Sequence, residues 1–399
     1  MDATVEQLGG VVIDALRAAG YLESTVGQYE KTIRYLNGFV ADRGGVYTPA
    51  LGVEFASMTS SPRTGRFSAQ RRFDYRRLVT LFDGLLDTGV VDLSVRGRGG
   101  GGPRPVSSEF TALEADWEND MEARDLAPAT RAAYGRVARG YLVFLESRGT
   151  GLENADGASV LAFLESLSER WAASSLFWVV SNFRPFLRFT GRPDLVEAAG
   201  LAGVKRSHRI LRVLTDEDQA RAVHACTSGL VCARDAAITL LALTTGLRAC
   251  DIVGLRLGDI DWRAQTIGIV QQKTRNPLTL PLVALVTAKL ADYVLHERPR
   301  SRDDHVFLRD NAPHTKLADH ASIYRVTATT FRTAGVTDIK VGTSVLRHSA
   351  ASRLLRAAVP LPTISAVLGH ASPESTNVYL SMDEARLLEC VLPVPAGAR

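Results

Sequence analysis

Ten consecutive residues, 96–105, rule out a fold made of one continuous domain. They read Arg-Gly-Arg-Gly-Gly-Gly-Gly-Pro-Arg-Pro. Successive glycines make any regular element entropically costly, and prolines lack the backbone N–H that helices and sheets use. Such a segment is typical of a flexible linker. At about 150 residues per domain, the 399 residues of the chain predict two or three domains.

The sequences on the two sides of this linker resemble each other. Six residue identities recur at a single offset of 105 positions. In both copies the apolar residues follow the i, i+3, i+4, i+7 spacing of a helix with one buried face. We interpret the two copies as small helical bundles that arose by duplication, with shared helix-forming composition as the alternative. The matched pairs are Thr25 and Thr130, Tyr29 and Tyr134, Arg34 and Arg139, Phe39 and Phe144, Arg43 and Arg148, and Gly44 and Gly149.

A second linker follows the second bundle. Residues 201–215 contain four cations and no acidic residue, and Thr215 is then followed by three acidic residues, 216–218. A threonine before acidic residues is typical of a helix start, because its side chain caps free N–H groups and the acids favour the positive end of the helix dipole. We predict a helical domain over 1–92, a Gly/Pro/Arg linker over 93–106, a second helical domain over 107–198, a basic linker over 199–213 and a larger domain with a C-terminal tail helix over 214–399.

The last domain is predicted to be mostly helical with one β-hairpin. Residues 266–274 alternate apolar and polar side chains, Asn276-Pro277 favours a turn, and residues 278–282 form the returning strand. The fold class is therefore mainly α with a small β-hairpin or sheet, an α+β chain in which two small helical bundles precede the larger domain.

Several protein classes are excluded by composition. No apolar run reaches 18 residues, so we expect no membrane span and no membrane partner. The acidic start Met1–Glu6 does not resemble a signal peptide. The four cysteines form no C-x-x-C pair, so we expect reduced thiols, no metal site and a cytoplasmic protein. A net charge of +4 does not by itself indicate a nucleic-acid partner.

The first candidate site residue is Arg248. An apolar helix over 236–243 is predicted to end at Gly246, and Arg248 opens the next helix. An arginine at the edge of a buried core needs an anion or a carboxylate. Asp251, three residues later on the same helical face, could pair with it, so a structural ion pair and an anion site are both open at this point.

Two later segments offer further cations and a tyrosine. Arg347 and His348 lie in Ser344-Val-Leu-Arg-His at the start of an apolar helix, where backbone N–H groups, an arginine and a histidine favour phosphate binding. His370 follows Leu368-Gly369, and Tyr379 lies nine residues beyond it. A single helical tyrosine is usually a core residue, and a strand lysine such as Lys273 is usually a solvated side chain.

Together these segments resemble the catalytic domain of the tyrosine recombinase, or phage integrase, family. The ordered set is Gly-Leu-Arg, a hairpin lysine, x-x-Leu-Arg-His, Leu-Gly-His and a tyrosine, over roughly residues 210–390. Block 107–198 resembles the family's core-binding domain, a small SAM-like helical bundle, and block 1–92 resembles a further DNA-binding copy of it.

The resemblance implies roles for single residues. Arg248 and Arg347 match the two catalytic arginines, Lys273 the catalytic lysine and His348 the histidine after the second arginine. His370 matches the position held by histidine or tryptophan, and Tyr379 matches the nucleophile. Ser344 replaces the first histidine of the family motif. A serine can donate a hydrogen bond but carries no charge near neutral pH. Three consequences are therefore open: slower cleavage, cleavage for which His348 and His370 suffice, and a degraded enzyme.

These roles imply a site-specific DNA recombinase of the integrase or transposase type. It would cleave and rejoin strands through a 3′-phosphotyrosine without metal, ATP or other cofactor. The arginines would compensate charge on the phosphate, Lys273 would protonate the leaving 5′-hydroxyl, and His348 would assist the tyrosine as a base. The alternatives are a type IB topoisomerase-like relaxing enzyme and a catalytically weakened DNA-binding protein.

Cations outside the predicted catalytic set suggest double-stranded DNA as the partner. The stretch 62–77 interleaves arginines with aromatic residues, and the second linker is basic, although a solvated arginine face is the alternative. We expect a monomer or dimer free in solution and a homotetramer on two DNA sites, in which the tail helix over 383–392 docks on a neighbouring subunit or on its own domain. The predicted DNA-binding residues are Arg71, Arg72, Arg76, Lys205, Arg206, Arg209 and Arg212.

Overall fold

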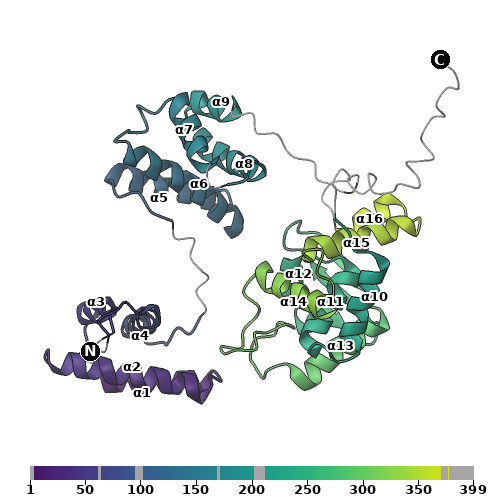
Figure 1. Ribbon diagram of the computed structural model, residues 1–399, viewed down its shortest axis with the longest axis horizontal. Coiled ribbons are helices and arrows are strands. Elements are labelled where there is room, and N and C mark those ends of the chain that lie inside the picture. The colour runs from purple at the N-terminus through teal and green to yellow at the C-terminus, as the bar shows by residue number, and fades with distance from the viewer. Residues whose placement is uncertain are drawn as a thin grey trace. The chain divides into compact units, whose positions relative to one another are not determined.

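The computed structural model describes residues 4–61, 64–94, 102–168, 171–201, 212–369 and 376. By backbone contacts, residues 1–95 group with 211–399 and residues 96–210 form a second unit. Separate hydrophobic cores lie in the first helical block, in the second block and in the C-terminal region (Figure 1). The described part of the chain is mainly helical with a small sheet, as predicted. No described helix combines the length and apolarity needed to cross a membrane.

Four helices form the described part of the first block. Local signals begin three of them, because Thr4, Thr48 and Ser68 each accept a hydrogen bond from a backbone N–H of the first turn. Gly89, with φ at 72°, ends the fourth. The helices pack their apolar faces around Leu36 and Phe82. They are α1 (Val5–Ala18), α2 (Glu23–Ala41), α3 (Pro49–Ser57) and α4 (Ala69–Thr88).

Where the structure describes it, the second block contains five helices around an aromatic core. Tyr141 and Phe183 pack at a ring-centroid distance of 4.8 Å, and Trp117 is buried beside them in the same core. Helix α9 extends to Leu201, so the domain end predicted at residue 198 falls inside a helix. The helices are α5 (Ser108–Ala123), α6 (Pro128–Ser147), α7 (Gly157–Ser168), α8 (Ala173–Phe189) and α9 (Pro193–Leu201).

The first two blocks share structural details at the sequence offset. The guanidinium of Arg43 lies 3.8 Å from the ring centroid of Phe39, and that of Arg148 lies 4.4 Å from the ring centroid of Phe144. Gly44 and Gly149 both have positive φ, at 107° and 61°. Helices α2 and α6 begin at residues 23 and 128, again 105 positions apart. These recurrences support the duplication, while the exact domain boundaries stay a prediction.

The C-terminal region wraps helices around a buried central helix. Helix α11 has ten buried residues, and α10, α13, α14 and α15 pack against it (Figure 1). Thr215 caps α10 by accepting from the backbone N–H of Asp218 at 3.1 Å, as predicted. The elements are α10 (Asp216–Thr227), α11 (Ala233–Thr245), α12 (Ala249–Gly254), η1 (Leu257–Asp259), α13 (Ala284–Asp292), η2 (Tyr293–Glu297), α14 (His320–Thr333), α15 (Thr343–Arg356) and α16 (Leu361–Leu368).

The sheet differs from the predicted hairpin in three ways: it has an extra strand, the first strand of the hairpin ends earlier, and the chain turns at residues 272–274 rather than at Asn276-Pro277, so that Pro277 begins the returning strand. It has three antiparallel strands in the order β1 (Ile260–Asp261), β2 (Thr266–Val270) and β3 (Pro277–Pro281). The short β1 was not predicted, because two residues carry no periodic signal. Strand β2 ends at Val270 rather than at residue 274, since residues 272–274 turn the chain and the backbone N–H of Gln271 already binds the carbonyl of Asn276 at 2.9 Å. Lys273 therefore lies in a turn.

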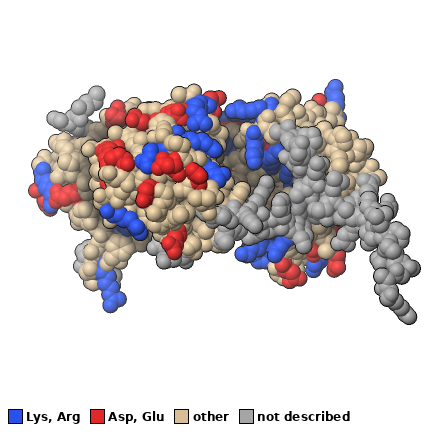
Figure 2. Space-filling model, turned by 90° about the horizontal axis from the view of Figure 1, so that it is seen from above, with Lys and Arg blue, Asp and Glu red and all other residues tan. Residues whose placement is uncertain are grey.

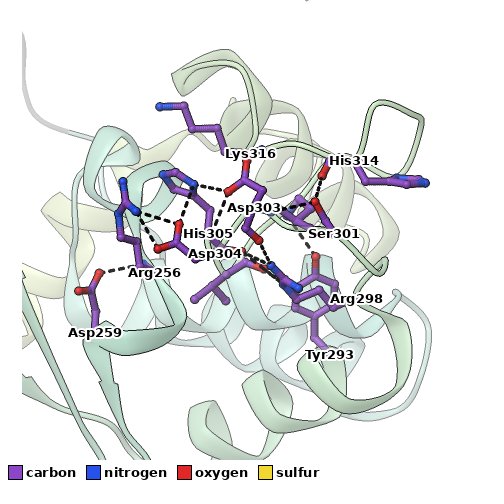
Figure 3. A network of polar contacts seen from close by, with 12 residues as sticks. Arg256, Asp259, Tyr293, Arg298, Ser301, Asp303, Asp304, His305, His314 and Lys316 are labelled. Carbon is purple, nitrogen blue, oxygen red and sulfur yellow. Dashed lines mark hydrogen bonds and ion pairs between the residues drawn. The ribbon is translucent and has the colours of Figure 1, made fainter. Parts of the chain in front are cut away.

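A polar network supports the loop between η2 and α14 (Figure 3). Arg298 donates to the backbone carbonyls of Asp303 and His305 at 2.6 and 2.8 Å. The Asp303 carboxylate accepts from the ring and backbone of His305 and from the backbone of Lys316. Burial opposes ionisation of Asp303, but these hydrogen bonds outweigh it and lower its pKa to about 2. Asp304 pairs with Arg256 at 2.7 Å. The carboxylates of Asp303 and Asp304 and the ring of His305 are thus all engaged in contacts that hold the loop.

Charges are mixed rather than segregated over the face seen in Figure 2, where lysine and arginine side chains alternate with aspartate and glutamate. The net charge of +4 therefore does not describe the charge of any one surface region, because acidic and basic side chains lie close together on this face.

Candidate active site

Arg248 lies at the junction of α11 and α12, two helices that the sequence predicts. Helix α11 ends at Gly246, whose φ is 65°, and Arg248 is the N-cap of α12. Its guanidinium donates to Oε1 of Gln271 at 2.9 Å and to the carbonyl of Gly369 at 3.1 Å. Of the two alternatives left open by the sequence, the ion pair with Asp251 is not formed among the described residues, since Arg248 binds Gln271 and Gly369 and Asp251 binds the backbone of Gln272. Arg248 is directed instead at the β2–β3 turn and the end of α16.

Asp251 is buried and acts on the same turn through another contact. Its side chain is only 3% exposed. One carboxylate oxygen, Oδ1, accepts from the backbone N–H of Gln272 at 2.9 Å, whereas Oδ2 has no hydrogen-bond partner among the described residues. Asp251 therefore fixes the start of the turn that carries Lys273, rather than neutralising Arg248.

Arg347 is the more deeply buried of the two arginines. It lies in the second turn of α15 and is 8% exposed. Its guanidinium donates to the carbonyl of Gly246 at 2.8 Å and to that of Leu368 at 2.7 Å. Arg248 and Arg347, almost 100 residues apart in sequence, thus bind the adjacent carbonyls of Gly369 and Leu368.

Gln271 links these groups, although nothing in the sequence marks it as a site residue. It is fully buried, and its amide donates to the carbonyl of Leu368 at 3.2 Å. Its Oε1 accepts from Arg248 and, at 2.7 Å, from the hydroxyl of Thr274. Its only sequence signal was its proximity to Lys273, because glutamine in a turn is ordinarily a surface residue.

The β2–β3 turn presents Lys273 beside the arginines. The turn is held on both sides of the lysine, by Gln271 and by Thr274, whose hydroxyl also lies 3.4 Å from the carbonyl of Gly369. Lys273 itself is exposed. Lys273 is thus an exposed residue on a turn whose flanking residues, Gln271 and Thr274, contact Arg248 and Gly369.

Ser344 and His348 occupy successive turns of α15. Ser344 is exposed in the first turn, two residues after the N-cap Gly342, and His348 follows four residues later and is half-buried. Residues four apart lie on the same helical face. Burial, and then the positive charge of Arg347, lower the pKa of His348, which favours the neutral form of its ring.

The remaining predicted residues are located only in part. His370 and Tyr379 lie outside the described residues, as do Lys205, Arg206 and Arg209. Gly369, the residue before His370, lies within the contacts described above. Among the predicted DNA-binding residues that are described, Arg72, Arg76 and Arg212 are exposed and Arg71 is half-buried.

This arrangement has the chemistry of an anion site. A guanidinium offers five N–H donors in a planar fork, so the two acceptors bound by Arg248 leave it capacity for a phosphate oxygen. Arg248 and Arg347 bind the carbonyls of Gly369 and Leu368, and Thr274 of the turn that carries Lys273 lies close to the same segment. Among the contacts described, only Asp251, which binds the turn backbone, brings a negative charge. Such a set suits an anionic centre that develops further negative charge during reaction.

Replacement of Gly369 by alanine tests whether this packing matters. Gly369 has φ at 61°, and a Cβ there would overlap the carboxamide of Gln271. We expect Gly369→Ala to lower stability by about 1–2 kcal/mol through the left-handed backbone alone and also to displace Gln271 from Arg248, slowing strand cleavage. Gly229→Ala is the matched control, because Gly229 also has positive φ but has open space around it. Equal melting temperatures with equal cleavage rates in both variants would contradict this account.

Comparison with known proteins adds an independent observation. Residues 212–386 match the model of the phage integrase family. The protein y4rF of Sinorhizobium fredii (strain NBRC 101917 / NGR234), named as an integrase/recombinase, is 32% identical over 69% of this chain and 67% of its own length. The tyrosine recombinase XerC of Rhizobium meliloti (strain 1021) is 30% identical over 72% of this chain and 96% of its own length.

Solved structures share the fold. The XerH site-specific recombinase, bound to a palindromic difH substrate, aligns with a TM-score of 0.55 at 16% identity, over 86% of this chain and 93% of that one. A lambda integrase tetramer bound to a Holliday junction aligns with a TM-score of 0.52 at 15% identity, over 79% of this chain and 90% of that one. At these identities the likeness concerns the fold alone.

Proposed function

This chain belongs to the phage integrase family of tyrosine recombinases and is a site-specific recombinase, and from this we propose that it cuts and rejoins double-stranded DNA by forming a covalent phosphotyrosine at Tyr379. The observation that carries the proposal is the convergence of Arg248, Arg347 and the Lys273 turn on residues 368–369. We further propose a reaction of the integrase or transposase type.

In this proposal the two arginines bind the scissile phosphate. Attack on a phosphodiester concentrates negative charge on the non-bridging oxygens of a five-coordinate phosphorus. The planar forks of Arg248 and Arg347 match those oxygens, and His370 adds a third donor. Their carbonyl and amide contacts keep both forks oriented before DNA arrives, so little reorganisation is needed during the reaction.

Two residues move the protons. The tyrosine hydroxyl must lose a proton as it attacks, and the neutral ring of His348 can accept it. The 5′-hydroxyl that leaves needs a proton, which the exposed ammonium of Lys273 can donate. The product is a 3′-phosphotyrosine and a free 5′-hydroxyl, and attack by a 5′-hydroxyl of a partner strand on that ester restores the phosphodiester and the tyrosine.

The role of His348 predicts the acid side of the pH profile. A protonated histidine cannot act as a base, so cleavage should fall as the pH drops through its pKa. Because burial and Arg347 lower that pKa, the midpoint should lie below 6.5. Single-turnover cleavage of a nicked duplex between pH 5 and 8 measures it, and His348→Gln should slow cleavage and remove this limb. A midpoint at or above 6.5, or an unchanged limb in the glutamine variant, would exclude His348 as the base.

The assembly and its compartment are also proposals. Recombination of two sites requires four strand cleavages, and each subunit here supplies one tyrosine nucleophile. We therefore propose a homotetramer on two DNA sites that forms from monomers or dimers in the cytoplasm. Support comes from the shared fold with the lambda integrase tetramer on a Holliday junction.

A nicked suicide substrate tests the proposed function. When cleavage releases a short 5′-ended fragment that diffuses away, the covalent intermediate cannot be reversed and accumulates as a protein–DNA adduct. We expect an adduct on the recognition duplex that survives denaturation. Absence of an adduct on that site would contradict the proposal, as would efficient relaxation of plasmids that lack the site.

A further inference from the structure

The carboxamide of Gln271 lies between Arg248 and the turn that carries Lys273. Its Oε1 accepts from the guanidinium of Arg248 at 2.9 Å and from the hydroxyl of Thr274 at 2.7 Å. Thr274 directly follows Lys273 in the sequence. A single oxygen atom thus joins Arg248, the N-cap of α12, to the turn between β2 and β3.

The contacts of this carboxamide admit only one orientation. Gln271 is fully buried, and a buried polar group needs a hydrogen-bond partner. Its amide nitrogen donates to the carbonyl of Leu368 at 3.2 Å. A flipped carboxamide would place its NH2 group against the donors of Arg248 and Thr274 and its oxygen against that carbonyl. The oxygen therefore stays directed at Arg248 and Thr274.

The backbone of the turn is also held in place. The N–H of Arg275 binds the carbonyl of Gln271 at 2.9 Å, and Asp251 accepts from the N–H of Gln272 at 2.9 Å. Among residues 271–275, the described hydrogen bonds involve every residue except Lys273. The backbone position of Lys273 is therefore set by its neighbours, while the residue itself stays exposed.

The two acceptors described for Arg248 are uncharged, namely the carboxamide of Gln271 and the carbonyl of Gly369. A carboxylate would also orient a guanidinium, but its negative charge would offset the positive charge that attracts a phosphate. A neutral amide orients Arg248 and leaves its charge to the substrate. This position therefore requires a glutamine rather than a glutamate.

We propose that Gln271 is a positioning residue that makes Arg248 and Lys273 act as one unit on the scissile phosphate. The inference deepens the proposed function and rests on it, because it assumes that a phosphodiester is cleaved at this site. Arg248 would bind a non-bridging oxygen and Lys273 would protonate the bridging 5′-oxygen of the same phosphorus. Both groups must be placed correctly at the same moment, since a misplacement of about 1 Å can slow a reaction about 100-fold.

A substrate whose leaving atom needs no proton tests this coupling. When sulfur replaces the bridging 5′-oxygen, the electron pair of the broken P–S bond stays on sulfur as a thiolate, which is a good leaving group because thiols have a pKa of about 8.5. We expect Gln271→Met to slow single-turnover cleavage of the oxygen substrate about 100-fold at saturating protein. The same variant should slow cleavage of the sulfur substrate only about 10-fold or less, because the proton from Lys273 is then not needed.

A second variant, Gln271→Glu, keeps the position of the turn but changes the charge. A glutamate still offers acceptors to Arg248 and Thr274, and its negative charge opposes that of Arg248. It should therefore slow cleavage of the oxygen and sulfur substrates by equal factors. Equal slowing of the two substrates in Gln271→Met, or a larger effect on the oxygen substrate in Gln271→Glu, would overturn the proposal.

Gln219 provides the matched control in the same domain. It is also buried, accepts from Arg353 at 2.8 Å and donates to the carbonyl of Leu214 at 3.3 Å. Gln219→Met should lower the melting temperature about as much as Gln271→Met does, yet cleave both substrates at nearly the wild-type rate. Equal losses of rate in the two methionine variants would show that Gln271 acts through folding alone and would overturn the proposal. Failure of the proposed function would instead leave the wild type without an adduct on either substrate.

Discussion

Replacing Tyr379 with phenylalanine is expected to abolish the covalent protein–DNA adduct completely while DNA binding persists. The phenyl ring keeps the shape of the side chain but has no hydroxyl oxygen with which to attack phosphorus. The change removes one oxygen atom and leaves Arg248, Arg347 and Lys273 in place. The readout is the adduct on a nicked substrate, resolved in a denaturing gel, alongside a binding measurement on the same duplex.

Tyr324→Phe is the control for this result. Tyr324 is an exposed tyrosine of α14 in the same domain, and removal of its hydroxyl should leave adduct formation at the wild-type level. If Tyr379→Phe still formed the adduct, or if it abolished DNA binding to the same extent, Tyr379 would not be the nucleophile of this chain.

Removal of the Arg347 guanidinium should have the next largest effect. We expect Arg347→Lys to slow cleavage by about 100-fold or more, the range found when one preorganised donor to a developing oxyanion is removed. Lysine keeps the charge, but a single ammonium cannot hold the carbonyls of Gly246 and Leu368 and also present a planar fork to a phosphate. Single-turnover cleavage at saturating protein separates this effect from weaker binding.

A neighbouring arginine shows whether such an effect is merely structural. Arg353, also on α15, donates to Gln219 at 2.8 Å and to the carbonyl of Leu243 at 2.9 Å, away from the candidate site. Arg353→Lys should lower the melting temperature about as much as Arg347→Lys does, yet cleave at nearly the wild-type rate. Parallel decreases of rate and stability in both variants would show that Arg347 acts through folding alone.

Local signals in the sequence predicted much of the fold. Thr215 with its acidic followers marked the start of α10, Gly246 marked the end of α11, and apolar periodicity outlined the helices of the two bundles. Each of these signals depends on residues within a few positions of one another. The resemblance to a family then grouped Arg248, Lys273 and Arg347, which no local pattern connects.

What the sequence could not predict depends on long-range contacts. Gln271 is buried because it meets the carbonyl of Leu368, 97 residues away, and nothing near Gln271 indicates this. Asp251 is spaced to pair with Arg248 along the helix, but α12 begins at Ala249 and the arginine extends from its N-cap toward Gly369. The predicted strand over 266–274 ran too long because its last residues follow the geometry of the turn rather than the alternation of side chains.

The most direct test of the central claim is to identify the residue that is joined to DNA in the trapped adduct. Protease digestion and mass spectrometry of the wild-type adduct should yield one modified peptide, with a nucleotide attached through its 3′-phosphate to the oxygen of Tyr379. A link to any other residue, or a link through a 5′-phosphate, would contradict the mechanism built on Arg248, Arg347 and the Lys273 turn.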